Sequence, residues 1–116
     1  MPVRAVAKLQ PPTIVPKDQF TDAQVAAGEG NYANCMVCHG FSAISVGVVP
    51  DLRRSSAIAS GEAFRSIVLG GALESQGMPN MTGRLNEDEV ETIRAYLADR
   101  ARLLAREDDI RRRVRD

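Results

Sequence analysis

Both cysteines and the only histidine of the chain lie within five consecutive residues, Cys35-Met36-Val37-Cys38-His39. Two thiols separated by two residues and followed directly by an imidazole form the C-x-x-C-H pattern. In that chemistry the thiols add to the vinyl groups of haem, and the histidine becomes an iron ligand. The pattern therefore predicts one covalent haem c, attached through Cys35 and Cys38 and ligated by His39.

Three other readings of the two cysteines compete with haem attachment. They are a simple disulfide, a thioredoxin-type redox pair and half of a zinc site. A redox pair is expected in a βαβ context, which this sequence lacks. A zinc site needs two further nitrogen or sulfur ligands, and no other Cys or His is present. Haem attachment is the interpretation that these residues favour.

Iron with six ligands needs a second axial group, and the candidates are the thioethers of Met36, Met78 and Met81. Met36 lies between the two cysteines and cannot reach the opposite face of the ring. Pro79 biases the residue before it toward an extended backbone, in a loop where Gly77 permits a close approach to a flat cofactor. We predict Met78 as the ligand, with Met81 as a packing residue.

Two further groups are candidates for contacts with the cofactor. The carbonyl of Pro50 is a candidate acceptor for the second ring N–H of His39, although Pro50 is equally explained as a residue that stiffens its loop. Arg53 and Arg54 follow closely, and a guanidinium pairs well with a haem propionate. Because one side of the chain faces the ring, we expect one of them, Arg53, to make this contact and the other to lie on the surface.

The predicted elements are all helical. Thr21 or Asp22 begins a helix over residues 22–34, Ser60 caps a helix over 61–69 that Gly70 and Gly71 end, and Asn86 begins the longest helix. In that helix the residues Val90, Ile93, Leu97, Ala101 and Leu104 form one apolar stripe. Long loops over 40–56 and 72–85 separate the helices. This pattern predicts a small all-α domain whose long loops need an anchor.

Composition narrows the possible functions. The chain has 116 residues with 15 basic and 15 acidic side chains, which fits one domain and argues against a nucleic-acid partner. No apolar run approaches the roughly 20 residues of a membrane-spanning helix, so we expect a soluble protein without a membrane span. We divide the chain into a Pro-rich linker or tail (1–19), a compact domain (20–105) and a charged extension (106–116).

The chain resembles the class I c-type cytochromes from about Thr21 to Leu104. The resemblance implies His39 and Met78 as axial ligands, and a crossing of the terminal helices in which Gly28 and Tyr32 pack against Tyr96 and Leu97. Tyr32 precedes Cys35 by three residues, where the family usually has four.

A closer similarity is to the C-terminal cytochrome domain of quinohaemoprotein alcohol dehydrogenases. The shared segments are Val49-Pro50-Asp51-Leu52-Arg53-Arg54-Ser55, Phe64 to Leu73 and Gly77-Met78-Pro79. In those enzymes a pyrroloquinoline quinone (PQQ) domain precedes the haem domain. The given sequence does not include such a domain, so we assign no quinone site and no alcohol site to its residues.

The resemblance implies an electron-transfer domain that is not itself an enzyme. Its donor would be a PQQ-dependent dehydrogenase, and its acceptor another redox protein or an electrode-type acceptor. A periplasmic location is implied, and residues 1–16 show no signal-peptide pattern, so we expect a mature chain or a piece of a longer protein. The alternatives are a haem enzyme or gas-binding sensor with a labile sixth ligand, and a haem-free interaction domain.

Overall fold

The computed structural model describes residues 11–35, 52–73 and 81–115, and within these ranges the fold is all-α. Three α-helices are present in them: α1 (Asp22–Asn31), α3 (Gly61–Val68) and α4 (Glu87–Arg115). The 3₁₀ turns η1 (Lys17–Gln19), η3 (Leu52–Arg54) and η4 (Ser56–Ala59) connect or flank them. The only β pairing in the described part is an isolated bridge between Thr82 and Leu85. The predicted fold class is confirmed.

Each helix begins where a side chain accepts a hydrogen bond from its first turn. Thr21 and Gln24 form a reciprocal capping box at the start of α1, and Ser60 caps α3. Before α4, the Asn86 side chain accepts from the Glu89 amide at 2.8 Å, while the Glu89 carboxylate accepts from the Asn86 amide at 3.0 Å. Such caps satisfy amide groups that have no partner within the helix, which is why the sequence located these starts correctly.

The ends of the two short helices differ slightly from the predicted ends. α1 ends at Asn31, earlier than the predicted residue 34, and the Cys35 amide donates to the Tyr32 carbonyl at 2.7 Å. Residues 33–35 are helical again, so the α-helical pattern is interrupted at Tyr32. α3 ends at Val68, one residue before the predicted end, and Gly71 adopts a φ of 71° just beyond it. Glycine tolerates this left-handed conformation, so the chain reverses here.

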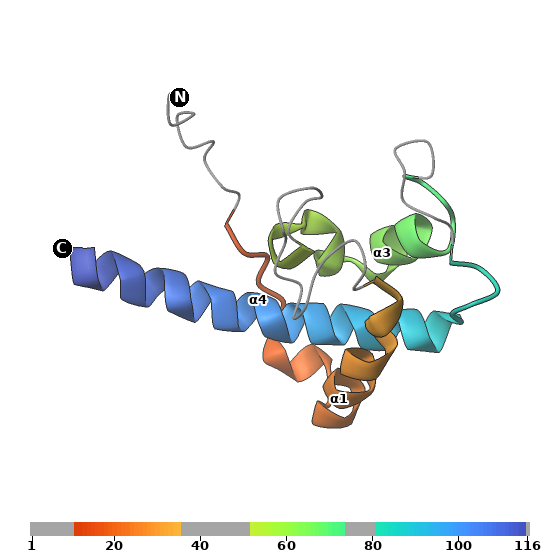
Figure 1. Ribbon diagram of the computed structural model, residues 1–116, viewed down its shortest axis with the longest axis horizontal. Coiled ribbons are helices and arrows are strands. Elements are labelled where there is room, and N and C mark those ends of the chain that lie inside the picture. Colours follow the sequence, from red (N-terminus) through yellow and green to blue (C-terminus); the bar gives the residue numbers. More distant parts are fainter. Residues whose placement is uncertain (1–10, 36–51, 74–80, 116) are drawn as a thin grey trace.

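α4 runs through the molecule, with α1 on one side and η4 and α3 on the other (Figure 1). It extends to Arg115, so the residues predicted as a solvated and frayed extension continue the same helix. Ile110 and Val114 on this part are 57% and 82% exposed. No helix in the described ranges combines the length and the apolar character that crossing a membrane requires.

The core is formed mainly by the apolar stripe of α4 and by what packs on it. The predicted stripe residues Val90, Ile93, Leu97, Ala101 and Leu104 are all buried. The main cluster of buried residues comprises Tyr32, Ile58, Phe64, Val68, Met81, Leu85, Val90, Ile93, Tyr96, Leu97 and Ala101. α4 therefore gathers residues from every other described α-helix into one core.

α1 crosses α4 at very short range. A Cβ atom on Gly28 would overlap the backbone carbonyl of Thr92 and would lie 2.9 Å from the Tyr96 Cβ, so only glycine fits there. One turn later the Tyr32 and Tyr96 rings pack with their centroids 5.4 Å apart. The Asn31 side-chain amide also donates to the Thr92 hydroxyl at 2.9 Å. The expected packing of Gly28 and Tyr32 at this crossing is confirmed.

Part of the N-terminal segment also packs on α4. Val15 is buried with Phe20, Ala95 and Ala98 in a second, smaller cluster. The Val15 carbonyl accepts a hydrogen bond from the Arg102 guanidinium at 3.1 Å. Residues 13–20 thus contribute to the core, although the prolines of this segment predict a linker.

The helix crossing yields a test with a matched control. We expect Gly28→Ala to destabilise the protein by roughly 1–3 kcal/mol, because the added methyl group forces the two helix backbones apart. Gly30 lies in the same helix with no atom near its Cβ direction, so Gly30→Ala should stabilise by about 0.5–1 kcal/mol through helix propensity. Urea unfolding of both variants measures the difference, and equal effects would contradict the close approach.

Candidate functional site

The first residue of the C-x-x-C-H motif lies just past the helix crossing. Cys35 is half-buried and packs against the main core cluster, three residues after the fully buried Tyr32. The remaining predicted site residues Cys38, His39, Pro50 and Met78 lie outside the described residues. Their roles therefore stay predictions.

Four half-buried apolar residues rest on the same core cluster: Cys35, Leu52, Ala57 and Leu69. They come from the end of α1, from η3, from η4 and from the end of α3. A haem is flat and largely apolar, and a thiol packed on an apolar core suits attachment to one of its vinyl groups. Cys35 and the other half-buried apolar residues on this core are of the kind that fit a haem.

The predicted propionate partner Arg53 lies in η3, which follows Pro50 closely in the chain. Arg53 is half-buried, and its backbone carbonyl accepts a hydrogen bond from the Thr13 amide at 3.0 Å. The neighbouring Arg54 is also half-buried and pairs with Asp108 of α4, with 3.4 Å between Nη2 and Oδ2. An ion pair with α4 thus holds the Arg54 side chain, which is not on the surface as expected for the second arginine.

The segment after the predicted ligand Met78 returns to the end of α3. The Met81 amide donates to the Val68 carbonyl at 2.8 Å, and the Thr82 hydroxyl donates to the Leu69 carbonyl at 2.7 Å. Met81 is 6% exposed and belongs to the main core cluster. It occupies the packing position that the sequence analysis assigned to it.

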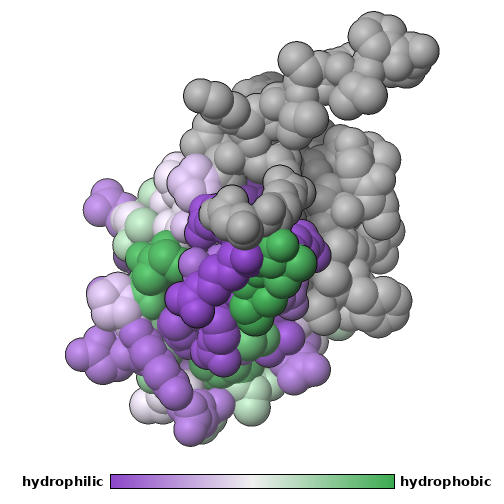
Figure 2. Space-filling view, turned by 90° about the vertical axis from the view of Figure 1, so that its left-hand side faces the viewer, coloured by the Kyte–Doolittle hydropathy of each residue, from purple (hydrophilic) through white to green (hydrophobic). Residues whose placement is uncertain are grey.

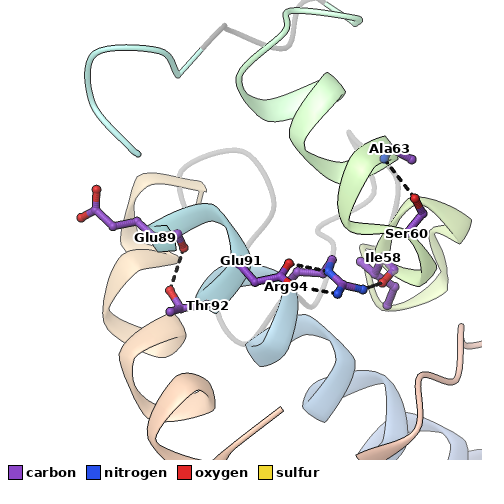
Figure 3. A network of polar contacts seen from close by, with 7 residues as sticks. All are labelled: Ile58, Ser60, Ala63, Glu89, Glu91, Thr92 and Arg94. Atoms are coloured by element: carbon purple, nitrogen blue, oxygen red, sulfur yellow. Dashed lines mark hydrogen bonds and ion pairs between the residues drawn. The ribbon is translucent and has the colours of Figure 1, made fainter. Parts of the chain in front are cut away.

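A buried arginine, which the sequence analysis did not identify, fastens η4 to α4 (Figure 3). Arg94 is 7% exposed, and it donates to the Ile58 carbonyl at 2.9 Å and to both carboxylate oxygens of Glu91 at 2.7 and 2.9 Å. Its guanidinium also lies 4.8 Å from the Phe20 ring centroid. The i,i+3 spacing of Glu91 and Arg94 signals the ion pair, but the sequence contains no signal for the contact with Ile58.

The guanidinium also changes the ionisation of its partner. Hydrogen bonds from Arg94 lower the pKa of the Glu91 carboxyl below its ordinary value of 4.5. Partial burial opposes this shift, while the positive charges of Arg94 and Arg65 support it. The charged form of Glu91 is thereby favoured, so the ion pair persists at moderately acidic pH.

Comparison with known protein families agrees with this arrangement. The family model for cytochrome c oxidase, cbb3-type, subunit III, matches residues 23–97, which is more than half of the chain. The chain belongs to this cytochrome c family. The matched residues include the helix crossing, the C-x-x-C-H motif, the Gly77-Met78-Pro79 segment and the first part of α4.

The cytochrome domain is also similar to parts of several dehydrogenases. It is 44% identical over 104 residues to the quinohemoprotein alcohol dehydrogenase ADH IIB of Pseudomonas putida, a match that covers 85% of this chain. Identity is 38% over 89 residues, or 76% of the chain, to the dehydrogenase subunit of the quinone alcohol dehydrogenase of Gluconacetobacter polyoxogenes. It is 35% over 81 residues, or 68% of the chain, to the quinohemoprotein alcohol dehydrogenase of Comamonas testosteroni.

These matches cover only a small share of each relative. The chain spans 14%, 12% and 11% of the lengths of these three proteins. The relationship is thus to one cytochrome-sized portion of each dehydrogenase. The predicted resemblance to their haem domains is confirmed.

The Glu91–Arg94 pair predicts a pH dependence of stability. Because folding lowers the pKa of Glu91, its ion pair contributes stability above pH 4.5, and this contribution is lost as the pH falls through the folded-state pKa. We expect Glu91→Gln to lower the free energy of unfolding at pH 6. At low pH the free energies of unfolding of the variant and the parent should converge. Urea unfolding between pH 3 and pH 7 measures this. In an Arg94→Met background, Glu91→Gln should change the free energy of unfolding at pH 6 much less. An unchanged effect in that background would contradict the assignment of the pH dependence to the Glu91–Arg94 ion pair.

Proposed function

We propose that this chain is a single-haem c-type cytochrome domain that transfers one electron at a time. The observation that carries the proposal is the C-x-x-C-H motif, whose first cysteine is half-buried on the core at the end of α1. Membership of the cytochrome c family and the packing of Cys35 on the main core cluster support it. One electron per cycle follows from a single iron that alternates between the ferric and ferrous states.

In this proposal Cys35 and Cys38 hold the haem covalently, and His39 and Met78 are its axial ligands. The packing of Met81 in the core supports the choice of Met78, because a thioether already used for packing is a poorer candidate for the iron. The hydrogen bond from Met81 to Val68 ties the segment after Met78 to the end of α3. This anchor favours a fixed position for the neighbouring residues.

Two further residues have proposed roles toward the cofactor. The Pro50 carbonyl accepts the second ring N–H of His39, which orients the imidazole and raises its basicity. Arg53 pairs with a haem propionate. The second arginine, Arg54, was expected on the surface, but its side chain is only 14% exposed and pairs with Asp108 of α4.

We propose a PQQ-dependent alcohol dehydrogenase as the electron donor and a second redox protein as the acceptor, in the periplasm. The proposal rests on the similarity to quinohemoprotein alcohol dehydrogenases. Within a small, transient interface the donor would approach an exposed edge of the haem. The domain itself would bind no alcohol, so its role is to carry electrons rather than to catalyse the oxidation.

Covalent attachment is tested by removing the thiols. The parent chain, produced in a host that matures c-type cytochromes, should retain its haem through acid–acetone extraction, because thioether bonds survive this treatment. The Cys35→Ala/Cys38→Ala variant should release all haem. Absorbance of the extracted protein and its mass measure both results. A parent protein whose mass equals that of the polypeptide alone would overturn the proposal and favour a haem-free interaction domain.

Axial ligation is tested with two matched methionine variants. Met78→Leu should abolish the weak far-red absorption band of Met-ligated ferric haem, lower the reduction potential and allow rapid carbon monoxide binding. Met81→Leu conserves core volume and should change none of these. Optical spectra and carbon monoxide kinetics distinguish the variants. Loss of the band in Met81→Leu alone would reverse the assignment, and rapid carbon monoxide binding by the parent would favour the sensor or enzyme alternative.

The proposed donor is tested by rapid mixing. A quinone-loaded alcohol dehydrogenase domain plus ethanol should reduce the ferric cytochrome domain, and the rise of the ferrous absorption bands follows the reaction. The same mixture without ethanol is the control. The absence of reduction under these conditions, with a chemically reducible haem, would exclude this class of donor while leaving electron transfer by the domain intact.

A further inference from the structure

The last part of α4 lies beyond the residues that the family model matches. That match ends at residue 97, whereas α4 continues to Arg115. Viewed from the side where α4 ends, the described surface is largely hydrophilic with apolar groups between (Figure 2). This part of the helix nevertheless contacts distant segments, and Arg102 and Asp108 supply polar contacts to them.

Asp108 pairs with Arg54, which is 54 residues earlier in the chain. The side chains of Arg54 and Asp108 are only 14% and 23% exposed, whereas those of Arg112 and Asp109 in a nearby pair are 71% and 47% exposed. A charge that is less exposed is less screened by water and salt. The Arg54–Asp108 pair is therefore less screened than the exposed pairs that Arg112 and Arg113 form with Asp109.

The N-terminal segment holds the same region from another direction. The Thr13 amide donates to the Arg53 carbonyl, and the Arg102 guanidinium of α4 donates to the Val15 carbonyl. Segment 13–15, η3 and the second half of α4 therefore form one connected unit. Arg54 is held within it.

η3 is also connected to the candidate haem site. Leu52, its first residue, packs on the main core cluster, and so does Cys35. In the proposed function Arg53 of the same turn pairs with a haem propionate, so a charge on η3 would lie near the haem. A positive charge near haem iron favours the ferrous form, since that form carries one positive charge fewer.

We propose that Asp108 is a positioning residue that sets the reduction potential of the haem through Arg54. It holds the guanidinium on η3 and offsets its positive charge, which lowers the potential. The inference rests on the proposed function, because it requires the haem. It gives the extension of α4 a role in tuning electron transfer.

The test compares two aspartates on the same helix in the haem-loaded full chain. Asp108→Asn should shift the equilibrium toward the ferrous form by about two- to threefold, or roughly 20–30 mV at about 59 mV per tenfold. Asp109→Asn makes the same change in net charge next to it, at the exposed pair with Arg113, and should shift the potential clearly less. Asp108→Glu should retain the parent potential. Spectroelectrochemical titration at low ionic strength measures all three.

A double-mutant cycle separates Arg54 from other partners of Asp108. Arg111 also lies 4.0 Å from Asp108 but is 68% exposed. In an Arg54→Gln background the direct charge effect of Asp108 remains but its hold on the guanidinium is lost, so Asp108→Asn should shift the potential clearly less than it does in the parent chain. An undiminished shift in that background, or equal shifts from the two aspartates, would overturn this inference while the haem remains in place. A chain without covalent haem would overturn the proposed function and this inference with it.

Discussion

The close approach of α1 and α4 at Gly28 is the constraint on which the rest of this structure depends. With no side chain at Gly28, the α1 backbone reaches the Thr92 carbonyl. The Tyr32 and Tyr96 rings then pack together one turn further along α1. Burial of each such large side chain contributes about 1.5–3 kcal/mol. Because Cys35 follows Tyr32 by three residues, this crossing also determines where the motif begins relative to the core.

On the other side of α4, polar contacts to backbone carbonyls hold segments that have little regular structure. Arg94 binds the Ile58 carbonyl of η4, and the segment at Met81 binds the Val68 carbonyl at the end of α3. Buried carbonyl groups need hydrogen-bond partners, and short turns supply few of their own. These contacts fasten the segments that bound the candidate haem site. The covalent haem that we propose would complete a core in which aromatic residues are few.

The helices were predictable because their signals are local. Thr21, Ser60 and Asn86 cap helices within three residues of themselves, and the apolar stripe of α4 repeats at helical spacing. The C-x-x-C-H motif is a local signal too, because its two thiols and its imidazole lie within five residues, and it indicated haem attachment. The end of α1 was less well predicted, because the interruption at Tyr32, after which residues 33–35 are helical again, is not encoded by a glycine or proline at that point.

By itself the sequence determined the fold class, the helix starts and the apolar face of α4, and its cysteine–histidine motif indicated the haem chemistry that we propose. Each of these depends on residues a few positions apart, whose spacing is set by the covalent chain and the helix repeat. Only the tertiary structure decided that Val15 packs beside Ala95, that Arg94 reaches Ile58, and that Arg54 pairs with Asp108. These partners are separated by 80, 36 and 54 residues, respectively. Many arginines and carboxylates offer alternative pairings at such separations, and only the packing of the helices selects among them.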